Sequence, residues 1–151
     1  MDHRAVGKVG ERFELDVERG KIREFARAVK SDNPDYTTGE APVIPPTFLT
    51  IAFHWERDVA GANPWSALGV DQRRGLHAEQ EYLFFGPPPH AGTRLTCQSR
   101  IERIYEKRGR RGGMLTFAVM VTQFFDASGK LVAEARMTGV ETAKNPEEPS
   151  P

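Results

Sequence analysis

The chain has few of the features that mark exported, membrane-bound or nucleic-acid-binding proteins. Its one cysteine, Cys97, cannot form an internal disulfide bond, which suits a reducing cytosol. Lysine plus arginine equals aspartate plus glutamate at 21 each, so no overall charge attracts nucleic acid or an anionic membrane. The first residues lack the apolar core of a signal peptide, and no apolar run is long enough to span a bilayer. We therefore expect a cytoplasmic protein that binds neither nucleic acid nor membrane.

Metal-binding residues and room for a second domain are also lacking. The 4 histidines are scattered and Cys97 stands alone, so we expect no metal site. A chain of 151 residues fits one domain, which we place at residues 1–142. From Asn145 onward the sequence carries proline and acidic residues with no apolar anchor, so we expect residues 143–151 to be a disordered tail.

Two helices are expected in the first half of the chain. Between Lys21 and Val29 the apolar residues recur at helical spacing, and Asn33-Pro34 is expected to end this helix because the residue before proline avoids helical geometry. Pro45-Pro46 opens a second helical segment. Its residues are apolar on nearly every side, which predicts a helix enclosed by other structure, with His54 packed inside.

The second half of the chain has the pattern of β-strands. We expect extended runs at Leu76–Phe85, from Leu95 to near Tyr105, at Met114–Phe125 and at Leu131–Val140, the last two joined by a tight hairpin turn at Asp126–Gly129. A buried helix followed by four long antiparallel strands predicts an α+β fold in which a sheet wraps a central helix. An open sheet exposes unpaired backbone groups at its edge, so we expect a dimer.

The stretch Ser31-Asp32-Asn33-Pro34-Asp35-Tyr36 resembles the active-site loop of MaoC-like dehydratases and R-specific enoyl-CoA hydratases, where it reads Asp-x-Asn-Pro-x-His. The order of three further segments strengthens the resemblance: Val17 to Phe25, Ala41 to Phe48 with its Pro-Pro-Thr-Phe, and Leu76 to Tyr82. The chain is most similar to the N-terminal, non-catalytic half-domains of double-hot-dog dehydratases and to free-standing structural subunits of 3-hydroxyacyl dehydratases. The resemblance implies a hot-dog fold that pairs into a double hot dog.

The same resemblance places Ser31 and Tyr36 at the positions of the catalytic aspartate and histidine. Hydroxyl groups titrate far above pH 7 and are poor general bases, so we expect neither residue to activate water. Pro46 falls at or beside the backbone N–H that receives the thioester oxygen in catalytic relatives, and proline has none to donate; a shift of one residue leaves Thr47 as the donor.

The resemblance also implies an acyl thioester as ligand, carried by coenzyme A or acyl carrier protein, and no other cofactor. The candidate substrate-binding residues are Asn33, Tyr36, Thr47, Phe48, Phe53 and His77. His77 is also the one candidate for a replacement base. The alternative is a hydrogen-bonded residue at a sheet or subunit interface, and the lack of an identifiable orienting partner favours this alternative. Arg108, Arg110 and Arg111 lie in a basic run that reads as a solvated turn or as a phosphate site for coenzyme A.

Three functions are compatible with these observations. The first is an accessory, substrate-binding subunit of an enoyl-thioester hydratase or 3-hydroxyacyl-thioester dehydratase, whose partner carries the catalytic Asp and His. The second is a stand-alone hydratase or thioesterase with a rearranged site around His77. The third is an acyl-thioester-binding protein without catalysis. Acyl chain length, carrier and reaction direction do not follow from the sequence.

Overall fold

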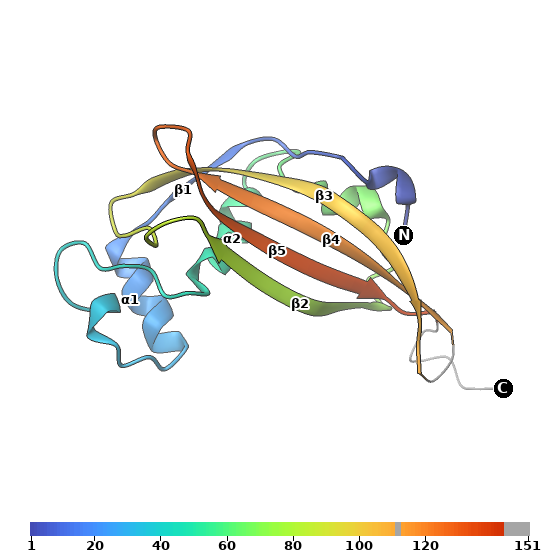
Figure 1. The fold of residues 1–151 in the computed structure, drawn as a ribbon, viewed down its shortest axis with the longest axis horizontal. Coiled ribbons are helices and arrows are strands. Elements are labelled where there is room, and N and C mark those ends of the chain that lie inside the picture. Colours follow the sequence, from blue (N-terminus) through green and yellow to red (C-terminus); the bar gives the residue numbers. More distant parts are fainter. Residues whose placement is uncertain (111–112, 144–151) are drawn as a thin grey trace.

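A five-stranded antiparallel sheet in the order β1-β3-β4-β5-β2 is the frame of the fold (Figure 1). The computed structural model describes residues 1–110 and 113–143. The strands are β1 (Phe13–Asp16), β2 (Gly75–Phe84), β3 (Arg94–Arg108), β4 (Met114–Phe125) and β5 (Leu131–Glu141), and the helices are α1 (Arg19–Ala28) and α2 (Ala52–Glu56). Short 3₁₀ turns occur at His3–Ala5, Pro34–Tyr36, Phe48–Ile51 and Pro64–Leu68.

The four predicted long strands and the hairpin turn are confirmed. The hairpin closes where the Asp126 carboxylate accepts hydrogen bonds from the backbone N–H groups of Ser128 and Lys130, and Gly129 adopts φ +81°. Strand β1 was not predicted, although Phe13, Leu15 and Val17 alternate with charged residues and are all buried. The predicted tail lies outside the described residues apart from Ala143, and the domain boundary at residue 142 stays a prediction.

Helix α1 forms as predicted, but Pro34 is not what ends it. The Ser31 N–H donates to the Ala26 carbonyl at 2.9 Å, and the Lys30 N–H donates to the Arg27 carbonyl at 3.0 Å. This pair of bonds is a Schellman motif, in which the residue after the C-cap takes a left-handed conformation. Lys30 does so, with φ 56°. The helix therefore ends at Ala28, six residues before Pro34, through its own backbone capping.

Helix α2 is short and packs on one side only. Phe48 and Leu49 in the preceding 3₁₀ turn are fully buried, with Phe48 set edge-on against Phe25 at 5.5 Å between ring centroids. Phe53, in contrast, is 47% exposed and stacks with His54, which is also exposed. The prediction of a packed His54 is therefore wrong, because the outward face of α2 has no covering element among the described residues.

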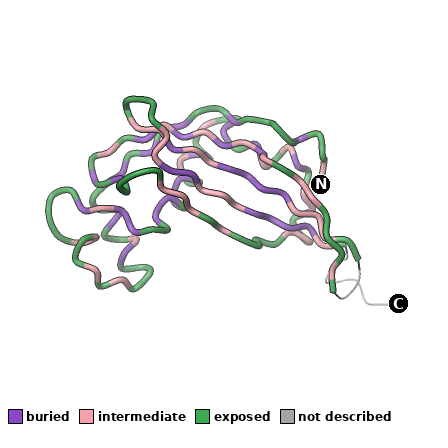
Figure 2. The backbone as a smooth tube through the Cα atoms, viewed as in Figure 1, coloured by how far each residue is buried: buried purple, intermediate pink, exposed green. Residues whose placement is uncertain are grey.

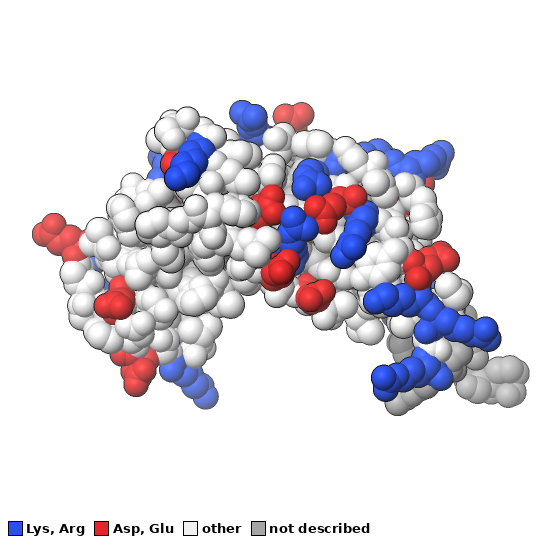
Figure 3. All heavy atoms as spheres, in the orientation of Figure 1, with Lys and Arg blue, Asp and Glu red and all other residues white. Residues whose placement is uncertain are grey.

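The two faces of the sheet differ in polarity. Helix α2 lies behind the sheet in Figure 1, and buried residues of the segment around it form one core cluster with residues of the strands. Figure 2 shows buried stretches both along the strands and in the segments behind them. The face toward the viewer carries opposite charges side by side (Figure 3). Arg136 on β5 is at their centre and pairs with Glu102 at 2.8 Å and with Glu134 at 2.9 Å. In the described ranges we find no helix with the length and apolar character needed to cross a membrane.

Candidate functional site

A cavity of about 310 Å³ lies between helix α2 and the covered face of the sheet. Fourteen residues line it, eight of them apolar and six polar. The apolar ones are Phe13, Leu49, Ala52, Phe53, Met120, Phe124, Ala135 and Met137; the polar ones are Thr50, Glu56, Asn63, His77, Gln80 and Thr122. An apolar cavity with a few polar groups is the usual form of a small-molecule site.

Exposure distinguishes the mouth of the cavity from its floor. The lining residues Thr50, Phe53, Asn63 and His77 are exposed and mark the mouth. The floor includes Phe124, which is fully buried, and Glu56, which is 3% exposed. A ligand entering at the α2 and β2 rim would therefore point its far end toward Glu56.

Glu56 is a carboxyl group in a mostly apolar wall. The Ser99 hydroxyl donates a 2.6 Å hydrogen bond to its Oε1 atom, and the same hydroxyl lies 2.8 Å from Thr122 Oγ1. Burial raises the pKa of Glu56 above its usual range, and the hydrogen bond from Ser99 opposes this only in part. The three side chains join α2 to β3 and β4 and give the cavity floor a polar, protonatable group.

A β-bulge turns His77 toward the cavity. His77 pairs with Gly139, but Glu79 pairs with Thr138, so Ala78 is an extra residue in β2. In a regular strand, residues 77 and 80 would face opposite sides of the sheet because side chains alternate. The extra residue puts His77 and Gln80 on the same face, where both line the cavity. Gln80 is held there by a 3.2 Å hydrogen bond from its Nε2 to the Arg136 carbonyl.

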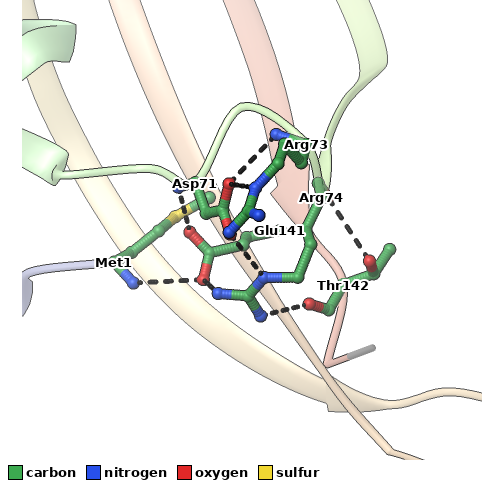
Figure 4. Close-up of polar contacts among 6 residues, drawn as sticks. All are labelled: Met1, Asp71, Arg73, Arg74, Glu141 and Thr142. Carbon is green, nitrogen blue, oxygen red and sulfur yellow. Dashed lines mark hydrogen bonds and ion pairs between the residues drawn. The ribbon is translucent and has the colours of Figure 1, made fainter. Parts of the chain in front are cut away.

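A cluster of six residues anchors the loop that leads into β2 (Figure 4). Arg74 donates to Glu141 Oε1 at 2.9 Å and to the Thr142 carbonyl at 2.7 Å, and the Thr142 N–H donates back to the Arg74 carbonyl at 3.0 Å. Hydrogen bonds from Arg73 lower the pKa of Asp71 to about 2, so this carboxylate is ionised at neutral pH. The cluster ties the start of β2, and with it His77, to the end of β5.

The loop that corresponds to the active-site loop of catalytic relatives does not line this cavity. Ser31 Oγ accepts a weak hydrogen bond from the Asn33 N–H at 3.4 Å, and Asn33 Oδ1 caps the following turn by accepting from the Asp35 N–H at 3.0 Å. Tyr36 is half-buried and packs against the core. The described loop therefore presents hydroxyl and amide groups where the catalytic sequence has a carboxylate and an imidazole.

The remaining predicted residues are spread over the molecule. Phe53 and His77 line the cavity, whereas Phe48 is buried in the core outside it. Pro46 and Thr47 form an exposed turn before α2. Arg108 at the end of β3 and Arg110 in the following turn are exposed, and Arg111 lies outside the described residues. Their predicted substrate and phosphate roles stay predictions.

Sequence reasoning missed Glu56, Ser99 and Thr122. Glu56 follows Leu49 and Ala52 at i+7 and i+4, so it lies on the buried stripe of the helical segment, and a charged residue at that spacing was the available signal. Within the described residues no group of three His, Cys, Asp or Glu side chains is arranged to hold a metal ion.

The sheet with a short helix on one face, and the cavity between them, define a hot-dog protein of the MaoC-like dehydratase type. The chain belongs to the family described as FAS1-like, dehydratase domain region, which matches residues 4–135. A UPF0336 protein of Saccharopolyspora erythraea is 32% identical over 142 residues, covering 87% of this chain and 86% of the relative. Another, from Streptomyces coelicolor, is 40% identical over 103 residues. This match covers 62% of this chain and 66% of the relative, which is just under two thirds of the relative's length.

Solved structures with the same fold include complexes of two hot-dog chains. The C-terminally truncated HadBC (3R-hydroxyacyl-ACP dehydratase) complex from Mycobacterium tuberculosis matches with a TM-score of 0.70 and 28% identity, over 93% of this chain and 98% of that one. The ChsH1–ChsH2 complex of the same organism matches with a TM-score of 0.69 over 95% of this chain and 87% of that one. Its identity is 14%, so this second match shows the fold alone.

Proposed function

We propose that this chain is the accessory, substrate-binding subunit of an enoyl-thioester hydratase or 3-hydroxyacyl-thioester dehydratase. Its cavity would hold the acyl group of a coenzyme A or acyl-carrier-protein thioester. A second hot-dog chain would supply the aspartate and histidine that add water to the 2-enoyl group or remove it from the 3-hydroxyacyl group.

The occupants of the loop positions carry this proposal. Hydration of a 2-enoyl thioester needs a base for the water and an acid for the carbon, and such proton transfers typically contribute about 10²–10⁴-fold to the rate. Ser31 and Tyr36 stand where catalytic relatives have aspartate and histidine. The Ser31 hydroxyl is engaged with the loop backbone, and Tyr36 is packed against the core.

The shape of the chain supports a partner. Strand β2 is at the edge of the sheet, and no other described strand pairs with its outer side. Figures 1 and 3 place this edge along the hollow side of an arched molecule. Leu76 on this edge strand is 63% exposed and Phe53 at the cavity mouth is 47% exposed, which leaves apolar surface for a second chain to cover.

Steady-state hydration of crotonyl-CoA tests the proposal. The purified chain alone should show negligible turnover, because it lacks the acid and base at the loop positions, and a hot-dog chain with Asp-x-Asn-Pro-x-His should be more active in its presence than without it. As a matched control, the same partner with its aspartate and histidine replaced by serine and tyrosine should leave the mixture inactive. High turnover by the pure chain would overturn the proposal.

One observation favours a second candidate, a stand-alone hydratase or thioesterase. His77 and Glu56 line the same cavity, so a protonatable carboxyl group and an imidazole face one space. Any turnover by the isolated chain would then depend on both groups, and His77→Ala would abolish it. Unchanged turnover in His77→Ala would remove this candidate.

A further inference from the structure

The polar floor of the cavity is unusual for a space that would hold a plain alkyl chain. Oε1 of Glu56 is bonded to Ser99, but the described residues offer no hydrogen-bond partner to Oε2. Among the described residues, every side-chain oxygen that is fully shielded from solvent has a hydrogen-bond partner. Because Oε2 has no such partner, it is not fully shielded and must face open space. The open space that Glu56 lines is the cavity.

A purely structural role for this carboxyl group would not require the cavity. A helix anchored to a sheet by Glu56, Ser99 and Thr122 would normally pack against it without a space of about 310 Å³ beside the anchor. An alkyl chain that filled the space would displace water from Oε2 and leave this oxygen without a hydrogen-bond partner. Burying a polar group without a partner has a high free-energy cost.

We infer that the cavity selects acyl thioesters whose chain carries a hydroxyl group at its far end, with Glu56 as the residue that recognises it. This inference rests on the proposed function, because it assumes that the cavity binds the acyl group. The charged carrier would stay outside the mouth, so the far end of the chain would reach Glu56 on the floor. The mouth is the one defined above by the exposed residues Thr50, Phe53, Asn63 and His77. A hydroxyl group donates one hydrogen bond and accepts others, which matches a carboxyl group that is itself bonded to Ser99.

Binding of matched ligands to the whole chain tests the inference. The probes are octanoyl-CoA against 8-hydroxyoctanoyl-CoA, and hexanoyl-CoA against 6-hydroxyhexanoyl-CoA, each titrated by calorimetry. At one or both chain lengths the hydroxylated ligand should bind at least tenfold more tightly, because a site built to hydrogen-bond a hydroxyl rejects the analogue that lacks it. Equal affinity within both pairs would overturn the inference and leave the proposed function standing.

Variants assign the preference to Glu56. Glu56→Met keeps a similar length without a hydrogen-bonding group and should reverse the preference, whereas Glu56→Gln should retain most of it. Asp58→Asn, a matched change at an exposed carboxyl two residues away, should leave it unaltered. A preference that survives in Glu56→Met would overturn the assignment.

The remaining outcomes also decide between the proposals. The preference for the hydroxylated ligand is measured on the unaltered chain. The inference can therefore be overturned even if a Glu56 variant fails to fold. If no acyl-CoA of either kind binds to the chain alone or with its partner, the proposed function fails together with the inference.

Discussion

Lys30 is the one described non-glycine residue with a positive φ, at 56°. This left-handed conformation brings the Cβ atom close to the following carbonyl oxygen and costs about 1–2 kcal/mol in residues other than glycine. The Schellman motif at the end of α1 requires it, because the N–H groups of Lys30 and Ser31 turn back to the last helical carbonyls.

Lys30→Gly should therefore stabilise the protein. Glycine adopts the same φ without the steric penalty, although its greater freedom in the unfolded chain offsets part of the gain, so we expect about 0.5–1 kcal/mol. In a thermal melt followed by circular dichroism this corresponds to a rise in Tm of about 1–4 °C. Arg27→Gly, in the right-handed part of the same helix, is the control and should lower Tm by a similar amount. A lower Tm in Lys30→Gly would contradict the assigned conformation.

Individual site residues could be predicted from the sequence only where they belong to a local pattern. Ser31 and Tyr36 are recognisable because Asn33-Pro34 fixes their spacing. Glu56 could not be assigned to a cavity in the same way, since Ser99 lies 43 residues beyond Glu56 and Thr122 lies another 23 residues beyond Ser99. Only the folded sheet brings these hydroxyl groups to the helix.

At the scale of elements, the long strands can be predicted from the alternation of their own residues and from the turn residues between them. The bulge in β2 cannot be predicted in this way. Nothing in Leu76-His77-Ala78-Glu79 marks one residue as extra, because the bulge arises from the pairing of β2 with β5. The bulge nevertheless decides which face His77 occupies. Strand pairing, and not the strand's own sequence, thus places this candidate residue at the cavity.

A close contact between elements occurs where Trp65 lies over Gly139 of β5. A Cβ atom added at Gly139 would meet the indole Cη2 and Cζ2 atoms at 2.6 Å, closer than such contacts allow. Gly139→Ala should therefore destabilise the fold by about 1–3 kcal/mol through overpacking. Denaturant unfolding of the purified chain would measure the loss.

The double variant locates the cause of this loss. Trp65→Leu removes the indole ring, so adding Gly139→Ala to it should cost clearly less than in the parent chain, and the difference is the coupling between the two sites. Gly20→Ala is the matched control, since a Cβ there meets nothing within 4 Å and alanine favours the helix. Full additivity of the two substitutions would show that Trp65 is not the obstacle.

At the scale of the whole molecule, a chain without net charge still has distinct surfaces. The outer face of the sheet carries paired charges around Arg136, which suit contact with water. At its edge, β2 has an outer side that no described strand pairs with, and it carries the exposed side chain of Leu76. An open edge of this length is a template for pairing with a second chain, and the cavity opens beside it at His77.

Substitution of Leu76 should therefore weaken assembly without unfolding the chain. In sedimentation velocity experiments we expect the unaltered chain, alone or with a catalytic hot-dog partner, to travel as a species of at least two chains. Leu76→Lys places a charge on the pairing edge and should shift the assembly toward single chains of 16.9 kDa. Val9→Lys alters a similarly exposed apolar residue beside β3, at the opposite edge of the sheet, and should leave assembly intact. If both substitutions act equally, or if Leu76→Lys has no effect, β2 is not the pairing edge and the partner covers another surface.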